Sequence, residues 1–440
     1  STNEFAAVFG TADIKSVGLL GAGHVGVCTM LSLAKRMPDV QFTMFDDNPS
    51  VVCAWQAGPP PVFEPGLEEL VNSLRGKNLV FTSSLEQTVK DSQVLFVCIN
   101  TPLKTGGAGA GRAADLSGWE NMARRIAIAS KGECKIVVES STIPVFTGNT
   151  MRKVLHAVGD AAKYEVLCLP SFYRGGSALA DLESPARLLL GAQDTPAGVI
   201  ASQAMTRFLS RWVPAENIVL SNLWSAELAK LAQNAMIAQR ISSTNAVSAL
   251  CEKTGADINE VMDVVGMDSR ISDGYLEACP GIGGPTLLQN LGMLVYLCES
   301  LQLHEVAQYW QSVLDMNAYQ QNRFCHNVVE TMTNVKGKKV AILGFAYKCN
   351  TSDARLSPAI EVCESLLAEG ADLHVYDPQV PYAKITETLS TKYASQIIHA
   401  ASAEEALKSA HAMIVITDWE QFKGIDMEEA YRGMAKPAYL

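Results

Sequence analysis

Three glycines near the start of the chain, Gly21, Gly23 and Gly26, have the GxGxxG spacing between a short apolar run and a segment of helical character. Asp46 ends a second apolar run, twenty residues after Gly26. Glycine N–H groups at a helix N-terminus can approach a pyrophosphate, and a carboxylate accepts hydrogen bonds from ribose hydroxyls while repelling a 2′-phosphate. The pattern predicts a dinucleotide site that prefers NAD to NADP. A glycine turn kept only for close packing is the alternative.

Two polar loops, Asn100-Thr101-Pro102 and Ser141-Thr142, each follow directly on an apolar run typical of a strand. Open α/β sheets place ligand-contacting loops at the carboxyl ends of their strands. The loops are therefore candidates for cofactor contact, with simple turns as the equally acceptable reading.

Further along, Lys230 and Asn234 are four residues apart in a segment of helical character. That spacing puts both side chains on one helix face, where they could bind one polar substrate group or simply be solvated. The glycines of the run Gly281-Ile-Gly283-Gly would let the backbone approach a ligand closely, although an interdomain turn explains them as well.

The elements around these residues follow an α/β pattern. Apolar runs at 16–20, 41–45, 79–81, 94–99, 135–138 and 165–169 alternate with helical segments, which predicts a parallel, doubly wound sheet. Long helical stretches at 225–254 and 287–301 follow, and a second strand-to-glycine start at 338–344 repeats the opening theme without GxGxxG. We expect two Rossmann-like domains, 1–222 and 335–440, joined by a helical domain, 223–334.

Composition narrows the class of protein. The 440 residues exceed one ordinary core, and 48% are hydrophobic. A formal charge of -11 argues against a nucleic-acid or anionic-membrane partner. Eleven widely spaced cysteines without a CxxC pair favour buried free thiols and no metal site. With no secretory signal pattern and no apolar run of membrane-spanning length, we expect a cytoplasmic protein.

Several longer motifs identify a resemblance. They are Phe63-Glu-Pro-Gly-Leu67, NTPLKT from Asn100, GRAADL from Gly111 and WSAELAKLAQNAMIAQRISS from Trp224. Over nearly all its length the chain resembles the UDP-glucose 6-dehydrogenases of the UDP-glucose/GDP-mannose dehydrogenase family. The resemblance implies an NAD-binding domain, a central helical dimerisation domain and a C-terminal UDP-sugar-binding domain. In the family, two NAD molecules oxidise UDP-glucose to UDP-glucuronate through a thiohemiacetal on a cysteine.

Four positions at the family's reaction centre are altered. Thr286 replaces the cysteine nucleophile, Ser171 and Asn290 replace a glutamate and an aspartate that serve proton transfer and catalytic water, and Gln289 replaces a lysine. Gly175 replaces a further glutamate. An alcohol needs a well-placed base to act as a nucleophile, so full four-electron activity is predicted to be absent.

Other family positions are retained. The resemblance assigns catalytic roles to Lys230, Asn234 and Thr142 and substrate contacts to Phe172, Lys230, Asn234, Arg270, Gly281, Gly283, Tyr347 and Lys348. Cofactor contacts would come from Gly21, Gly23, Gly26, Asp46, Asn100, Thr101, Pro102, Ser141, Thr142 and Arg355. Val51 replaces a cofactor-contacting arginine, which weakens the expected binding of NAD.

The leading hypothesis is a catalytically degenerate homologue with a structural or regulatory role. It would form a homodimer or larger homo-oligomer, with a structural protein partner and retained binding of NAD and a UDP-sugar left open. The alternative is an enzyme that stops at the aldehyde, because hydride transfer needs a base such as Lys230 but no cysteine. Full activity with Cys279 swung into the site would need a large loop rearrangement.

Overall fold

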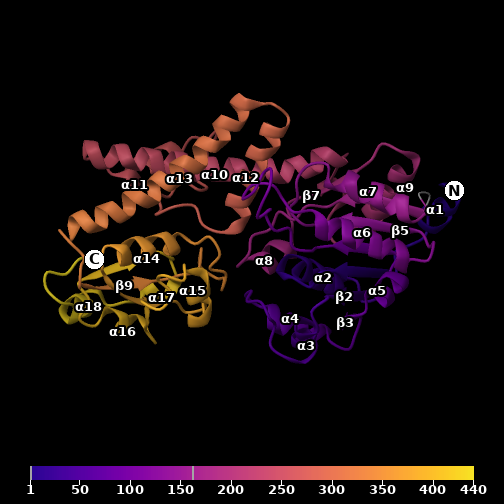
Figure 1. Cartoon of the computed structure of the whole chain (residues 1–440). Coiled ribbons are helices and arrows are strands. Elements are labelled where there is room, and N and C mark those ends of the chain that lie inside the picture. Colours follow the sequence, from indigo (N-terminus) through magenta and orange to yellow (C-terminus); the bar gives the residue numbers. More distant parts are fainter. Residues whose placement is uncertain (1, 161–162) are drawn as a thin grey trace. The chain divides into compact units, whose positions relative to one another are not determined.

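The computed structural model describes residues 2–160 and 163–440. The chain forms two compact units, Ser1–Gln233 and Asn234–Leu440, drawn from indigo to yellow along the sequence in Figure 1. The predicted mixed α/β architecture with parallel sheets is confirmed. The domain limits near residues 222 and 334 stay a prediction.

The first unit contains an eight-stranded sheet. Its spatial order is β3-β2-β1-β4-β5-β6-β7-β8, and the first six strands follow the doubly wound order of a dinucleotide-binding fold. All pairs are parallel except β6 with β7. The strands are β1 (Ser16–Leu20), β2 (Gln41–Phe45), β3 (Leu79–Thr82), β4 (Val94–Val97), β5 (Lys135–Glu139), β6 (Tyr164–Cys168), β7 (Leu188–Ala192) and β8 (Ile218–Asn222).

Alternate side chains of these strands enter two separate cores. In β4, Val94 and Phe96 join one core while Leu95 and Val97 join the other, as the period of two in a strand requires. The first core is covered by α1 (Thr2–Phe9), α2 (His24–Arg36), α3 (Pro49–Ala57), α4 (Leu67–Leu74), α8 (Ala178–Glu183) and α9 (Pro196–Leu209). The second is covered by α5 (Leu85–Asp91), α6 (Ser117–Ala129) and α7 (Thr147–Val158). Both faces of the sheet are thus buried.

A 32-residue helix, α10 (Leu223–Thr254), follows the sheet. In the second unit its residues Ala235 and Ala238 share a core with Leu291, Leu294 and Val295. The other helices of this region are α11 (Ile258–Gly266), α12 (Pro285–Ser300) and α13 (His304–Thr331). The helical layer expected after residue 222 is therefore present, and α13 extends it beyond the two stretches that the sequence indicated.

The second unit also contains a four-stranded parallel sheet, in the order β11-β10-β9-β12. Its strands are β9 (Lys339–Leu343), β10 (Asp372–Tyr376), β11 (Ile398–His399) and β12 (Ala412–Val415). They lie among α14 (Pro358–Ala368), α15 (Tyr382–Thr388), α16 (Ala403–Leu407), α17 (Glu420–Lys423) and α18 (Met427–Gly433). Figure 1 shows this sheet in orange and yellow. The order repeats the first half of the larger sheet.

All eleven cysteines are free, and seven of them are buried. Across residues 2–160 and 163–440, the structure contains no helix long and apolar enough to cross a membrane.

Candidate cofactor and substrate sites

Each glycine of the first turn has a distinct role. Gly21 has φ +100°, and a Cβ there would lie 2.6 Å from the Cys98 carbonyl oxygen. A Cβ on Gly26 would lie 2.7 Å from the Leu19 side chain, so this glycine allows close packing of helix on strand. A Cβ on Gly23 would meet nothing within 4 Å, and α2 begins at the next residue. The open space therefore lies where a pyrophosphate would sit on the helix N-terminus.

Asp46 directly follows β2, is half-buried and accepts one hydrogen bond on each carboxylate oxygen. Its Oδ2 accepts a hydrogen bond from the Ala22 N–H at 3.0 Å, and its Oδ1 accepts one from the Asn48 N–H at 2.9 Å. Each carboxylate oxygen can accept more than one hydrogen bond, so both remain able to bind ribose hydroxyls. The glycine turn and Asp46 together fit the diphosphate and ribose of NAD.

Hydroxyl groups connect the loops at the carboxyl edge of the first sheet. The Ser141 hydroxyl donates to the Ile99 carbonyl at 3.0 Å, and the Ser140 hydroxyl donates to the Leu169 carbonyl at 3.1 Å. The loops after β4, β5 and β6 are therefore held together, which brings the polar loops predicted around residues 100 and 141 to one place.

The individual residues of these loops differ in exposure. Thr101 is buried, and its hydroxyl accepts a hydrogen bond from Trp119 Nε1 at 3.0 Å. Asn100 and Pro102 are exposed, and Thr142 is half-buried. Asn100, Pro102 and Thr142 thus remain accessible to a ligand, while Thr101 has a structural role in addition.

The first turn of α2 is tied to the segment after β6 by Glu64, which sequence reasoning did not single out as a site residue. Its buried carboxylate accepts hydrogen bonds from the N–H groups of Gly176 and Ala178 at 2.7 and 2.6 Å, and pairs with His24 Nε2 at 2.7 Å. A glutamate inside an otherwise apolar motif, Phe63-Glu-Pro-Gly-Leu67, was the signal available. The bridge fixes the start of the cofactor helix relative to residues 176–178.

Two buried glutamates meet at the start of α7, and both were missed from sequence. Glu227 accepts hydrogen bonds from the Phe146 and Gly148 N–H groups at 2.7 and 2.8 Å. A Cβ on Gly148 would lie 2.9 Å from Glu139 Oε2 and 3.2 Å from Glu227 Oε1. Burial, and then the Glu227 carboxylate, raise the pKa of Glu139 well above its usual value. Burial also raises the pKa of Glu227, although the Gly148 and Phe146 N–H groups oppose this shift. Glu139 is thus the member of the pair that burial and its neighbour drive toward the neutral acid, while the helix N-terminus favours a charge on Glu227.

Lys230 lies one turn further along α10, on the ring of Phe172. Its ammonium is 5.3 Å from the ring centre, and the Arg187 guanidinium carbon is 4.9 Å from the same centre. Lys230 is only 7% exposed. Burial, followed by the charge of Arg187, lowers its pKa to about 8. The structure therefore brings together Lys230 and Phe172, both predicted substrate residues, and adds Arg187.

In the second unit the glycine-rich run packs directly on Tyr347. A Cβ on Gly284 would lie 2.6 Å from the Tyr347 ring, and a Cβ on Gly283 would lie 3.1 Å from the Tyr347 carbonyl oxygen. A Cβ on Gly281 would lie 2.7 Å from Gln321. The structure thus brings the predicted substrate residues Gly283 and Tyr347 together, and the glycines are needed for this close approach.

Two altered catalytic positions, Thr286 and Asn290, lie in α12, and the retained Asn234 lies in α10. Thr286 is exposed, directly after Pro285 at the first position of the helix. Asn290 is 2% exposed and Asn234 is 3% exposed. The amide nitrogens of both asparagines are buried without a hydrogen-bond partner in the described part of the chain. Two buried donors are therefore available to an acceptor group.

The three remaining cationic candidates lie apart from these asparagines in sequence. The exposed guanidinium of Arg270 is held by Asp268, with Nε 3.0 Å from Oδ1. The Arg355 guanidinium is held in the same way by Asp353. Lys348 is half-buried and follows Tyr347. Each arginine is thus paired with a carboxylate two residues before it.

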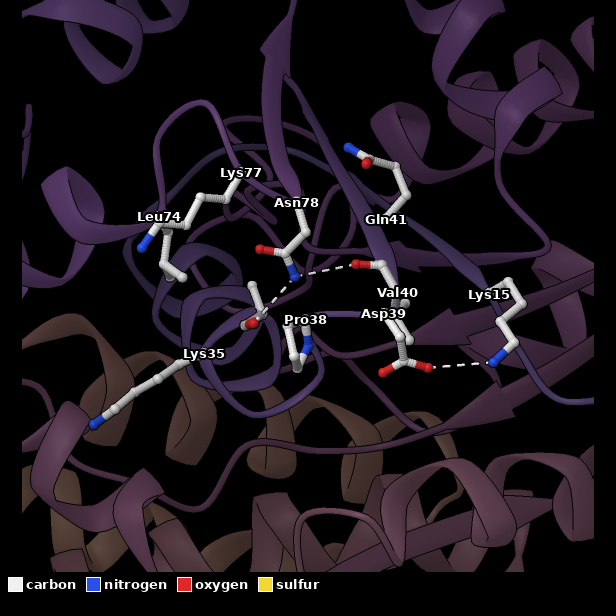
Figure 2. A pocket seen from close by; sticks show the side chains of 10 residues that line it. Lys15, Lys35, Pro38, Asp39, Val40, Gln41, Leu74, Lys77 and Asn78 are labelled. Atoms are coloured by element: carbon white, nitrogen blue, oxygen red, sulfur yellow. Dashed lines mark hydrogen bonds and ion pairs between the residues drawn. The ribbon is translucent and has the colours of Figure 1, made fainter.

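A pocket of about 520 Å³ lies near the amino end of β2, whereas the glycine turn and Asp46 lie at the carboxyl edge of the sheet. Figure 2 shows Lys15 directed to Asp39 at 3.2 Å, and the Asn78 amide directed to backbone carbonyls, among them that of Val40 at 3.1 Å. The pocket therefore lies at the other edge of the sheet and is not a candidate for the cofactor.

Comparison with known proteins covers nearly all of the chain. The NAD binding domain of the UDP-glucose/GDP-mannose dehydrogenase family matches residues 15–209, its central domain matches 224–319, and its UDP binding domain matches 341–440. The chain is 44% identical to UDP-glucose 6-dehydrogenase 4 of Arabidopsis thaliana, over 96% of this chain and 91% of that protein. It is also 44% identical to UDP-glucose 6-dehydrogenase of Pongo abelii, over 97% of this chain and 88% of that protein.

Among solved structures, a UDP-glucose dehydrogenase from the archaeon Pyrobaculum islandicum has a TM-score of 0.86 and 28% identity, over 98% of both chains. The three matched parts follow one another in the order that the sequence predicted. The chain belongs to the UDP-glucose/GDP-mannose dehydrogenase family, with that family's NAD-binding domain at its N-terminal end.

Proposed function

We propose that this protein is a catalytically degenerate UDP-glucose dehydrogenase homologue that retains binding of NAD and a UDP-sugar and has a structural or regulatory role. The observation that carries the proposal is Thr286 in place of the cysteine nucleophile. The domain limits near 222 and 334, and the roles assigned to individual site residues, belong to the same proposal.

The second oxidation step, from aldehyde to carboxylate, needs a nucleophile at the position that Thr286 occupies. Bound NAD supplies a hydride acceptor, but the aldehyde must also form a covalent adduct with a nucleophile in the thiohemiacetal route. The Thr286 hydroxyl is exposed, and its neighbours at 285 and 287 are a proline and a leucine. Asn290 and Ser171, which replace acids, cannot take up a proton near neutral pH. These three substitutions support loss of the four-electron reaction.

Cys279 is poorly suited to replace the missing thiol. Its N–H donates to Asn245 Oδ1 at 2.9 Å, and its carbonyl accepts from Gln320 Nε2 at 2.7 Å. Its thiol lies 3.4 Å from the Gly281 carbonyl oxygen, and burial raises the thiol pKa. Because both sides of the peptide backbone are held and the thiolate is disfavoured, full activity through Cys279 is not supported.

The test is direct. Concentrated protein is incubated with UDP-glucose and NAD, and reduced nicotinamide is counted per protein site, with a cysteine-containing relative as positive control. We expect less than one equivalent over hours, together with thermal stabilisation by NAD and by UDP-glucose. Catalytic or stoichiometric reduction would contradict the proposal.

A reconstruction series sharpens the test. Thr286→Cys alone is expected to remain inactive, because the acids at 171 and 290 are still absent. The triple variant Thr286→Cys, Ser171→Glu, Asn290→Asp is expected to gain measurable UDP-glucuronate production. If the triple variant stays inactive while binding both ligands, the degeneracy has spread beyond these positions.

A second candidate function is oxidation of the alcohol to the aldehyde alone. It is favoured by Lys230, whose lowered pKa of about 8 makes the neutral amine more accessible as a base. This enzyme would release one reduced nicotinamide per UDP-sugar and an aldehyde that hydroxylamine traps. Lys230→Met would abolish both products.

The exposed apolar surface of the helical region supports the proposed homodimer. The exposed side chains are Met236, Leu250, Val264 and Met267, which are 65%, 64%, 68% and 83% exposed. A surface with several exposed, large apolar side chains is typical of an oligomer interface. Light scattering on the full chain is expected to give a dimer or larger assembly, and Val264→Glu with Met267→Glu is expected to give monomer. A structural protein partner and a cytoplasmic location remain further parts of the proposal.

A further inference from the structure

Lys230 is a buried cation without an acid. It is 7% exposed, and within residues 2–160 and 163–440 its ammonium forms no hydrogen bond or ion pair, only the contact with Phe172 at 5.3 Å. The charged group that acts on Lys230 is a second cation, Arg187, on the same ring. A buried ammonium without a counter-ion is costly, so this arrangement is best completed by an anion that is not part of the chain.

The Lys230 side chain is still charged under ordinary conditions. A lysine with a pKa of about 8 is about 90% protonated at pH 7, despite its burial. The face of Phe172 attracts the positive charge but accepts no conventional hydrogen bond, so the ammonium N–H donors remain available. Arg187 donates to Gln233 Oε1 at 2.9 Å through one nitrogen, which leaves donors on the rest of its guanidinium.

The chemistry of this cluster selects the ligand. Lys230 and Arg187 supply donors and positive charge and no acceptor, which suits a carboxylate better than the neutral hydroxymethyl group of a hexose, because the charge-assisted hydrogen bond is stronger. Ser171, next to Phe172 in the chain, carries no charge that would compete for the ammonium. We propose that Lys230, Arg187 and Phe172 form a carboxylate site, and that the protein prefers a UDP-sugar bearing a carboxylate, a UDP-uronate, to the corresponding UDP-hexose.

This inference rests on the proposed binding of a UDP-sugar and deepens it. A chain with this site would respond to the oxidised sugar nucleotide, the product of the reaction class that its active relatives catalyse. In the aldehyde-forming alternative Lys230 acts as a base and must be neutral. In the carboxylate site Lys230 binds an anion and must be charged. The two readings therefore differ in the protonation state that each needs.

Isothermal titration of the full chain at pH 7 with UDP-glucuronate, UDP-glucose and UDP tests the proposal. We expect UDP-glucuronate to bind at least about tenfold more tightly than UDP-glucose, as a close charge pair in a partly buried site would give. Lys230→Met is expected to remove this preference and to leave UDP affinity unchanged. Lys77→Met, which removes an exposed charge at the other edge of the sheet, is the matched control and should keep the preference.

Ser171→Glu provides the reverse test. A carboxylate at position 171 would compete for Lys230, so the variant is expected to lose at least about tenfold in UDP-glucuronate affinity while UDP binding persists. A wild-type protein that binds both sugar nucleotides equally, or a Ser171→Glu variant with an unchanged preference, would overturn the carboxylate site while leaving the proposed function intact. Failure of all three ligands to bind would overturn both, and turnover of UDP-glucose would overturn the proposed function alone.

The pH dependence of UDP-glucuronate affinity distinguishes Lys230 as a charged carboxylate-binding group from Lys230 as a neutral base. The charged groups to consider are Arg187, on the same Phe172 ring, and Glu227, which faces the start of α7 one turn before Lys230. As the pH rises above about 8, Lys230 loses its proton and UDP-glucuronate affinity is expected to fall, whereas UDP and UDP-glucose affinities should not change with it. An unchanged UDP-glucuronate affinity between pH 7 and pH 9.5 would rule out Lys230 as the carboxylate-binding group.

Discussion

Both sheets begin with the same turn, and only one of the two turns is open to a ligand. The Gly21 N–H donates to the Phe45 carbonyl at 2.9 Å, and the Gly344 N–H donates to the Tyr376 carbonyl at 2.8 Å. Both glycines have positive φ, +100° and +89°. An aspartate follows the paired strand in each case, Asp46 after β2 and Asp377 after β10. The backbone starts alike, so the difference must lie in how the two aspartates are bound and in the helices that follow the turns.

The two aspartates differ in how fully the chain satisfies them. Asp46 is half-buried and accepts one hydrogen bond on each oxygen. Asp377 is 6% exposed and accepts five. Its donors are the N–H groups of Phe345, Ala346, Gln379 and Val380 and the Trp419 Nε1–H group. The Asp377 carboxylate has no lone pair left to accept a hydrogen bond from a ribose hydroxyl. It occupies the position at the turn that a ligand would need.

The helices that follow the turns differ as well. α2 begins at His24, immediately after Gly23, and presents free backbone N–H groups. α14 begins at Pro358, which has no N–H group, and the Ser357 hydroxyl caps the Ala359 N–H. Helix N–H donors are thus used or absent in the second unit. A strand–glycine turn is therefore not enough for dinucleotide binding, which also needs an unsatisfied acceptor and an open helix N-terminus.

The largest expected effect is on the aspartate that closes the second turn. Asp377→Ala would leave five buried or partly buried donors without their acceptor, and we expect a loss of about 3–5 kcal/mol in the free energy of unfolding of its unit. Asp46→Ala, the matched variant, should cost about 1 kcal/mol or less but weaken NAD binding at least about tenfold. Urea denaturation followed by circular dichroism, with NAD titration, measures both.

A reversed pattern, with Asp46 needed for folding and Asp377 for NAD affinity, would break the comparison between the two turns. Equal stability losses for the two variants would show that the hydrogen-bond count at Asp377 does not determine its importance.

The next effect concerns the glycine with positive φ that the two turns share, Gly21 in the first and Gly344 in the second. Alanine at Gly344 would place a Cβ 2.7 Å from the Thr417 backbone nitrogen, and alanine at Gly21 would place one 2.6 Å from the Cys98 carbonyl oxygen. With the positive φ added, we expect each variant to lose about 2–4 kcal/mol of stability, measured by urea denaturation. Gly76→Ala, at φ +73° with no atom near its Cβ, is the control and should lose only about 1 kcal/mol. A loss at Gly344 no larger than at Gly76 would contradict the close-contact argument.

The third effect belongs to the open turn alone. Gly23 has φ -80° and ψ 171°, which alanine adopts freely, and its Cβ would meet nothing. Gly23→Ala is therefore expected to change stability by less than about 0.5 kcal/mol but to weaken NAD at least about tenfold, because a methyl group would fill the space for the diphosphate. Gly118→Ala, in α6 with its nearest contact at 3.8 Å, is the control and should leave NAD affinity unchanged. Unchanged NAD affinity in Gly23→Ala would place the diphosphate elsewhere.

Sequence pattern predicted β1 to β6, the glycine turn and the doubly wound sheet, because each depends on local periodicity or spacing, but it did not predict β7 and β8. Residues 41–45 were predicted as a strand with the bounds observed for β2. The closure of the second turn could not be predicted, because Trp419 lies far from Asp377 in sequence. Glu139, Glu227 and Arg187 were missed for the same reason: their roles come from burial and from contacts between separate elements, which a single sequence does not record.

The smallest effect concerns a carboxyl group at a strand end that, unlike Asp377, is satisfied by no donor. Both Glu139 oxygens are buried without a hydrogen-bond partner in the described part of the chain. Because burial and Glu227 raise the pKa of Glu139 in the folded protein, its contribution to stability is fully present below the unfolded value of 4.5. That contribution is lost progressively as the pH rises toward the folded value.

Glu139→Gln keeps the shape and a donor but cannot ionise. We compare the free energy of unfolding of the variant with that of wild type by urea denaturation. The difference in favour of the variant should be at least about 1 kcal/mol larger at pH 8 than at pH 5. Glu227→Gln is the contrasting variant and should be less stable at both pH values, because the amide has one acceptor oxygen for the two N–H groups of Phe146 and Gly148. If the stability difference between Glu139→Gln and wild type did not change with pH, Glu139 would be ionised in the folded protein, and the distinction between satisfied and unsatisfied strand-end carboxyl groups would fail.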